Sequence, residues 1–130
     1  MGSHRKLIRI QLVDDNEVTR ALLRGILRGE EYEVVGEASD GEQGIEMALR
    51  LKPDVLCLDI SMPKADGLEV LRQVRAQLPE TVVLMVTSHT EREMVQQAVQ
   101  SGASGYIVKP FNSGKVLDTI GRAVGRKPAS

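Results

Sequence analysis

Val55-Leu56-Cys57-Leu58 is a short, wholly apolar run that stops abruptly at Asp59. A strand has such a wholly apolar sequence when helices cover both of its faces, because neither face then meets water. Strands of this kind belong to parallel sheets, in which a helix crosses over from one strand to the next. The stretch 55–59 therefore predicts a central strand of a parallel α/β sheet with a carboxylate at its carboxyl end.

Further β-rich runs lie on both sides of this stretch. They cover residues 7–13, 32–38, 82–86 and 104–108. Between them, apolar residues recur at helical spacing, as Val18, Leu22, Leu23, Ile26 and Leu27 do. The strand–helix pair occurs five times, which predicts a five-stranded parallel sheet of the doubly wound (βα)5 type, with helices on both faces.

Capping residues mark the helix ends. Asp40 with Gln43, Asp66 with Glu69, and Thr90 with Glu93 have the spacing of a capping box at a helix start. Asn112 is expected to begin the last helix, and Gly102 to end the fourth one. Arg20, Arg24 and Arg28 lie four apart on the first helix, and we interpret them as a solvated face rather than as a binding patch.

Length and composition limit the function. The 130 residues suit one domain, which we expect over residues 7–125, followed by a tail at 126–130. Residues 1–6 are similar to an expression-tag remnant and are expected to be disordered. A net charge of −1 offers no general attraction to nucleic acid or to an anionic membrane. Cys57 is the only cysteine, which suits a reducing cytoplasm and a packing role, and no apolar run is long enough for a membrane span.

Chemically active side chains follow the predicted strands. Asp14-Asp15 follow the first strand, Asp59 the third, Thr87-Ser88 the fourth and Lys109 the fifth. The carboxyl ends of parallel strands meet at one sheet edge, where ligands of such folds bind. We therefore expect three carboxylates, a hydroxyl and an ammonium group to lie together.

This combination has a defined chemistry. Two carboxylates about 5 Å apart repel by roughly 3 kcal/mol at an effective dielectric constant of 20. Such a cluster recruits a cation, and oxygen-only ligands favour Mg²⁺. A carboxylate can accept a phosphoryl group to give an aspartyl phosphate, while a lysine stabilises the phosphoryl oxygens.

Four motifs now resemble those of a known family. They are Val13-Asp14-Asp15, the run 58–63 from Leu58 to Pro63, Val86-Thr87-Ser88 and Val108-Lys109-Pro110. In this order at strand ends, they are similar to the receiver domain of two-component response regulators, the CheY-like family, over Leu7 to about Val124. The resemblance implies a flavodoxin-like sheet of strand order 2-1-3-4-5.

The resemblance also implies roles for single residues. Asp59 matches the phosphoacceptor, Asp15 the carboxylate that binds Mg²⁺ directly, and Asp14 the one that acts through water. Ser61 stands where the family uses a backbone carbonyl as a metal ligand. Thr87 and Lys109 match the phosphate-binding hydroxyl and ammonium groups.

Further matched positions concern signalling. Tyr106 matches the aromatic residue that moves together with Thr87 as a switch. Ser61 and His89 stand where the family tunes the lifetime of the phosphoryl group. We hypothesise that His89 overhangs the site and makes this lifetime depend on pH near neutrality.

The resemblance implies partners as well. A sensor histidine kinase or a phosphotransfer protein would donate the phosphoryl group, docking near Val18 and Leu22. The fourth helix, fifth strand and fifth helix would form the output face, for a downstream protein or for a homodimer, without direct nucleic-acid binding or membrane insertion. Catalysis would be self-directed rather than enzymatic. The alternative is the receiver of a multidomain transcription regulator whose output domain is absent.

Two other classes fit the sequence less well. Haloacid-dehalogenase-type phosphatases need a second aspartate two residues after the nucleophile, where Ser61 stands here. A flavodoxin needs a phosphate-binding loop after the first strand, where Asp14-Asp15 would repel the flavin phosphate. No P-loop or dinucleotide glycine motif is present.

Overall fold

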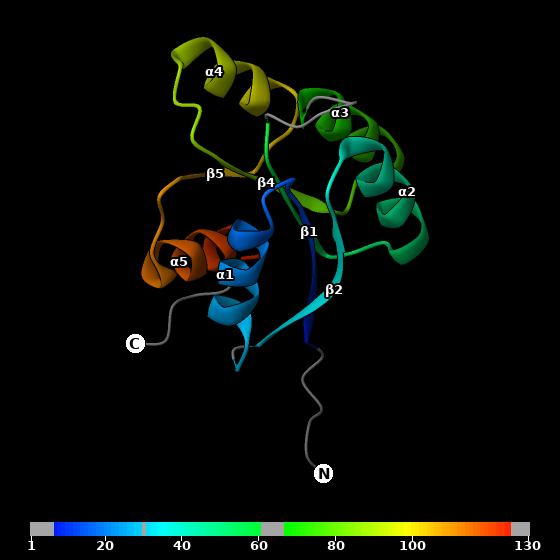
Figure 1. Ribbon diagram of the computed structural model, residues 1–130. Coiled ribbons are helices and arrows are strands. Elements are labelled where there is room, and N and C mark those ends of the chain that lie inside the picture. Colours follow the sequence, from blue (N-terminus) through cyan, green and yellow to red (C-terminus); the bar gives the residue numbers. More distant parts are fainter. Residues whose placement is uncertain (1–6, 30, 61–66, 126–130) are drawn as a thin grey trace.

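The computed structural model describes residues 7–29, 31–60 and 67–125 (Figure 1). The expected tag remnant and tail, Ser61 and the cap expected at Asp66 lie outside the described residues. None of the described helices has the length and apolar character needed to cross a lipid bilayer.

A parallel sheet forms the centre of the molecule, as predicted. Its strands are β1 (Ile8–Val13), β2 (Tyr32–Ala38), β3 (Val55–Leu58), β4 (Val82–Thr87) and β5 (Gly105–Val108). They pair in the order β2-β1-β3-β4-β5, and each pair is parallel. The predicted fold class and strand order are confirmed, and β3, the strand between β1 and β4, is buried along its whole length.

Helices cover both faces of this sheet (Figure 1). They are α1 (Glu17–Leu27), α2 (Gly41–Leu51), α3 (Gly67–Gln77), α4 (Arg92–Gln100) and α5 (Ser113–Ala123). On one face, α1 and α5 bury residues such as Leu23 and Ile120 against β1, β3 and β4. On the other, α2, α3 and α4 bury Ala48, Leu71 and Ala98. Because neither face of β3 meets water, its apolar sequence is explained.

The helix starts agree with the predicted caps in two cases. The Asp40 carboxylate accepts from the Gln43 N–H at 2.9 Å, and the Asn112 side chain accepts from the Lys115 N–H at 2.8 Å. Gly102, with φ +106°, follows the end of α4 as expected. The Lys109–Pro110 peptide bond is cis.

The cap predicted at Thr90 is wrong. Helix α4 begins at Arg92, and its N-cap is Glu91, whose side chain makes no capping hydrogen bond. Other hydrogen bonds hold the preceding loop. The His89 N–H donates to the Thr87 hydroxyl, and the His89 carbonyl accepts from the Tyr106 hydroxyl. These contacts fix the loop so that the helix starts later than the capping box requires.

The interpretation of the arginine stripe is also wrong in part. Arg28 is exposed, but Arg20 and Arg24 are partly buried because both reach Glu37 on β2. The sequence pattern placed these arginines on one helix face without showing which acid lies beneath it. Arg20 and Arg24 therefore form an ion-pair cluster with Glu37 near the end of β2, and only Arg28 fits the predicted solvated face.

Candidate functional site

Three carboxylates lie together at the carboxyl edge of the sheet, as the sequence predicted. Asp14, Asp15 and Asp59 each offer an oxygen within 4.8 Å of the others. They follow β1 and β3, which are paired neighbours with Val13 opposite Leu58. Asp14 and Asp59 are buried and Asp15 is exposed, so the cluster opens to solvent on the side of Asp15.

Backbone contacts hold the two strand ends. The Asp59 N–H donates to the Val13 carbonyl at 3.1 Å, and the Asp14 N–H donates to the Ala38 carbonyl at 3.0 Å. These bonds continue the ladder one residue beyond the strands, so the carboxylates are carried by a rigid sheet edge rather than by a free loop.

Gly67 is a site residue that the sequence reasoning missed. It begins α3, its N–H donates to the Ile60 carbonyl at 2.8 Å, and a Cβ at this position would lie 2.3 Å from the Asp59 carbonyl oxygen. Only glycine permits this close approach. A glycine at the expected start of a helix, where it is intrinsically unfavourable, was the signal that could have identified it.

Lys109 lies against two of the carboxylates. Its Nζ is 2.8 Å from Asp14 Oδ2 and 3.2 Å from Asp59 Oδ2. Burial lowers the pKa of Lys109, but the hydrogen bonds and charges of Asp14 and Asp59 outweigh it, so the pKa is raised above 10.5. Lys109 is therefore a cation at neutral pH.

The pKa of Asp14 is determined mainly by the burial of its carboxyl group. Desolvation raises the pKa of its carboxyl above 3.8, and the Asp59 charge adds to this, although Lys109 and the Asn16 N–H lower it in part. Asn16, not the aspartate pair, caps α1, because its side chain accepts from the Val18 and Thr19 N–H groups at 2.8 and 3.2 Å. The Asp14 carboxylate is thus not used as a helix cap.

The net charge of these groups favours binding of a divalent cation. Three carboxylates and one ammonium sum to −2, and every carboxylate oxygen is a hard ligand of the kind that Mg²⁺ prefers. Cys57 has no part in this chemistry: burial raises the pKa of its thiol to about 12, so it stays neutral in the core, as predicted.

A second group of predicted residues lies at the ends of β4 and β5. Thr87 is fully buried, and its hydroxyl accepts from the His89 N–H at 3.3 Å. The Tyr106 hydroxyl donates to the His89 carbonyl. Thr87 and Tyr106 are therefore connected through the backbone of His89, a link that sequence alone did not reveal. The His89 imidazole lies 3.3 Å from the Glu91 carboxylate.

Comparison with known proteins agrees with this geometry. A family model described as the response regulator receiver domain matches residues 10–121. The chain is 36% identical over 117 residues to chemotaxis protein CheY of Listeria monocytogenes, which covers 90% of this chain and 98% of that protein.

Solved structures are similar as well. The response regulator domain of Thermotoga maritima CheB matches with a TM-score of 0.85 and 35% identity, covering 94% of this chain and 99% of that one. The CheX–CheY–BeF₃–Mg²⁺ complex of Borrelia burgdorferi matches with a TM-score of 0.87 and 29% identity, over 92% of this chain and 90% of that one.

Proposed function

This chain belongs to the response regulator receiver domain family, and from that premise we propose that Asp59 is the residue that accepts the phosphoryl group. The observation that carries the proposal is the order of the strands. Asp59 follows β3, which lies between β1, followed by Asp14 and Asp15, and β4, which ends at Thr87, and Lys109 after β5 reaches both Asp14 and Asp59. A phosphoryl group on Asp59 would thus lie between a cation-binding side and a side that donates hydrogen bonds.

The reaction follows from this placement. A carboxylate oxygen of Asp59 attacks the phosphorus atom of a phosphohistidine or of a small acyl phosphate. The new P–O bond forms as the P–N or P–O bond of the donor breaks, and the electron pair leaves with the imidazole or carboxylate. Lys109, at 3.2 Å from Asp59, stabilises the transferred oxygens. The family acts in signalling rather than as classical enzymes, so the phosphoryl group is transferred to the domain's own Asp59 and not to a separate acceptor.

We assign a Mg²⁺ site to the same cluster. Asp15 and Asp59 would bind the ion directly, Asp14 through water, and the Ser61 carbonyl, which lies outside the described residues, would complete the protein ligands. When bound, Mg²⁺ supplies the positive charge that offsets the carboxylates and the oxygens of the incoming group.

The switch would work through His89. In this structure the Thr87 hydroxyl accepts from the His89 N–H, and Tyr106 donates to the His89 carbonyl. If Thr87 turns to donate to a phosphoryl oxygen, the His89 N–H loses its acceptor and the loop held by Tyr106 can rearrange. Phosphorylation would then shift the population between two arrangements of this loop. Ser61 and His89 would tune the lifetime of the phosphoryl group.

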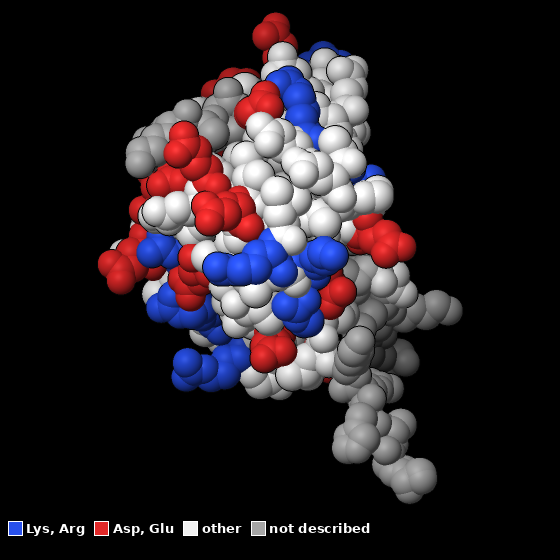
Figure 2. Space-filling view, turned by 90° about the vertical axis from the view of Figure 1, so that its right-hand side faces the viewer, with Lys and Arg blue, Asp and Glu red and all other residues white. Residues whose placement is uncertain are grey.

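Two surfaces suit the partners that a receiver needs. Val18 and Leu22 of α1 are 66% and 56% exposed, and this apolar pair would dock a histidine kinase or a phosphotransfer protein. Figure 2, which shows the side of α2, has lysine and arginine side chains beside acidic ones. No extended surface of one sign covers that face.

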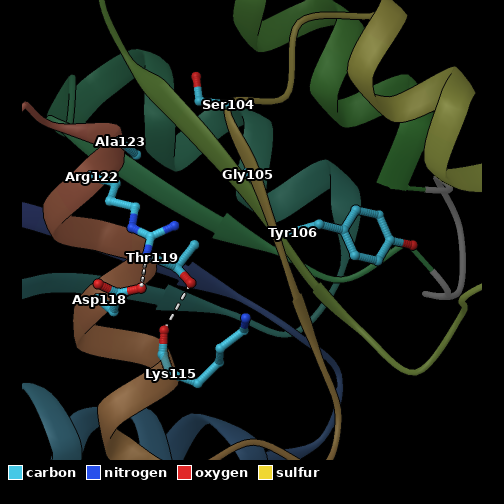
Figure 3. A pocket seen from close by; sticks show the side chains of 8 residues that line it. All are labelled: Ser104, Gly105, Tyr106, Lys115, Asp118, Thr119, Arg122 and Ala123. Carbon is cyan, nitrogen blue, oxygen red and sulfur yellow. Dashed lines mark hydrogen bonds and ion pairs between the residues drawn. The ribbon is translucent and has the colours of Figure 1, made fainter.

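The α4-β5-α5 face would carry the output. Between β5 and α5 lies a hollow of about 280 Å³ (Figure 3). Lys115 and Arg122 line it, while the Tyr106 ring points to the other side of β5. Asp118 pairs with Arg122 at 3.0 Å, and no ion pair to Lys115 is found among the described residues, so the hollow keeps a positive charge. A downstream segment with a carboxylate, or a second copy of the chain, would fit here.

The output partner could be a second copy of the chain or a different protein, and the receiver could act alone or within a transcription regulator. A homodimer on the α4-β5-α5 face would show as a mass increase in solution when beryllofluoride and Mg²⁺ are added. A monomer at high concentration under both conditions would contradict the dimer and favour a different protein as the partner.

Beryllofluoride, a mimic of the phosphoryl group, also tests the site itself. In a ¹⁵N-labelled sample, the amide signals of Asp59, Thr87 and Lys109 should shift when beryllofluoride and Mg²⁺ are added together. Asp59→Asn, which keeps the shape of the side chain but not its charge, should show no shift beyond the one that Mg²⁺ alone causes. An equal response in Asp59→Asn would contradict the assignment of the acceptor.

A further inference from the structure

The position of Asp15 depends on the backbone. Its carboxylate is the exposed member of the acidic cluster, and no hydrogen bond or ion pair to its side chain is found in the described part of the chain. Asp14, in contrast, is held by Lys109 through Oδ2 and by the Asn16 N–H through Oδ1. The Asp14–Asp15 peptide is therefore what directs Asp15 towards the other two carboxylates.

Arg20 holds this peptide. From the first turns of α1, its Nη1 donates to the backbone carbonyl of Asp14. Its Nε is 3.0 Å from Glu37 Oε1, and the Arg20 side chain is only 16% exposed. One planar guanidinium thus connects the end of β2 to the peptide between the two aspartates, a geometry that suits arginine because its donors point in fixed, different directions.

The charge of Arg20 is offset only in part, because the single carboxylate of Glu37 is shared by two arginines. Glu37 accepts from Arg20, and it also accepts from Arg24 Nη1 at 2.6 and 2.7 Å. Arg24 resembles Arg20 in residue type, helix and acidic partner, but only Arg20 also donates to Asp14. Comparing a variant of Arg20 with a variant of Arg24 therefore distinguishes the effect of a positive charge near the site from the effect of a hydrogen bond to the site.

We infer that Arg20 is a positioning residue of the acidic site: by fixing the Asp14–Asp15 peptide, it orients Asp15 for Mg²⁺. The inference rests on the proposed Mg²⁺ site and adds a residue from outside the strand-end motifs. Arg20 touches neither the metal nor the phosphoryl group, and it acts through the backbone carbonyl of Asp14.

The sign of the effect distinguishes this role from electrostatics. Removing a nearby cation should strengthen Mg²⁺ binding if charge alone mattered, because the site becomes more negative. Loss of the bond to Asp14 should weaken it, because Asp15 then samples positions away from the cluster. Arg20→Gln should therefore weaken Mg²⁺ binding, while Arg24→Gln should leave it unchanged or strengthen it.

Titration calorimetry with Mg²⁺ alone tests the inference, and urea unfolding checks that each variant folds. We expect the Kd for Mg²⁺ to rise roughly tenfold in Arg20→Gln, as for other residues that hold metal ligands in place. In ¹⁵N spectra of the metal-free protein, the Asp15 amide signal should shift in Arg20→Gln and stay in Arg24→Gln. If Arg20→Gln does not fold, Arg20→Lys and Arg24→Lys give the same comparison.

Two results would overturn the inference. One is a parent-like Kd and Asp15 signal in the Arg20 variant, and the other is an equal loss of affinity in both arginine variants. Failure of the parent itself to bind Mg²⁺ would overturn the proposed metal site as well, and this outcome is distinguishable because it does not depend on Arg20.

Discussion

At the scale of single residues, the raised pKa of Asp14 predicts how the stability of the protein depends on pH. The pKa of its carboxyl is raised in the folded protein, mainly by burial, so the folded state binds this proton more readily than the unfolded state. The contribution of Asp14 to stability is therefore present at low pH and is lost as the pH rises through its folded-state pKa.

The comparison with Asp14→Asn isolates this contribution. In metal-free buffer, the free energy of unfolding of the parent minus that of Asp14→Asn should fall as the pH rises from about 4, the ordinary pKa of an aspartate, through the raised pKa of Asp14, because only the parent has a titrating group at position 14. Urea unfolding at several pH values measures this difference. A difference that rises with pH would mean that Lys109 outweighs burial.

Gly67 gives a second prediction at this scale. Gly67→Ala would place a Cβ 2.3 Å from the Asp59 carbonyl oxygen, so the backbone at the acceptor must move. We expect the free energy of unfolding to fall by about 1–3 kcal/mol, as in other overpacked sites, and phosphorylation of Asp59 to slow.

Gly25→Ala is the matched control. A Cβ at Gly25, within α1, would meet no atom within 4 Å. This variant should gain about 0.5–1 kcal/mol from helix propensity and keep the parent rate of phosphorylation. Equal stability of the two alanine variants would contradict the close contact at Gly67.

His89 has the third residue-scale prediction. Its backbone links Thr87 to Tyr106, and its imidazole lies 3.3 Å from the Glu91 carboxylate. We predict that His89→Ala changes the dephosphorylation rate and removes its pH dependence. Rates equal to those of the parent from about pH 6 to about pH 8, the range in which a histidine titrates, would contradict the hypothesis.

At the scale of elements, the strands were predictable and the contacts between elements were not. Residues 55–58 were predicted with the observed bounds because a strand buried on both faces has a wholly apolar sequence, and residues 32–38, the half-buried edge strand, because the β-rich run stops at Ser39-Asp40-Gly41. The capping pair at Thr90 failed because the loop is held by Tyr106, a residue far along the chain. Gln11 shows the same limit, since it is fully buried in β1 and donates to the Gly44 carbonyl of α2.

The caps give an element-scale prediction. The Asn112 side chain caps α5, whereas the Glu91 side chain makes no capping bond at α4. Asn112→Ala should lower the free energy of unfolding by about 1 kcal/mol, and Glu91→Ala should change it by only a few tenths. Thermal or urea unfolding of both variants measures this contrast. Equal losses would mean that Glu91 stabilises α4 in another way.

At the scale of the whole molecule, the site follows from the topology. The order β2-β1-β3-β4-β5 places the acidic ends of β1 and β3 together and adds Thr87 and Lys109 from the next two strands. Sequence reasoning could predict this set because the strand-end rule needs only the order of the elements. Arg20 and Gly67 could not be placed in the same way, because their contacts with Asp14 and Asp59 depend on how helices pack on the sheet.

The intact mass after incubation with acetyl phosphate and Mg²⁺ tests the central claim most directly. The parent should gain one phosphoryl group, and the gain should be absent in Asp59→Asn and when EDTA removes the metal. A gain of the same size in Asp59→Asn would contradict Asp59 as the acceptor. A parent that gains nothing and also fails to bind beryllofluoride would contradict the phosphoacceptor account of the acidic site.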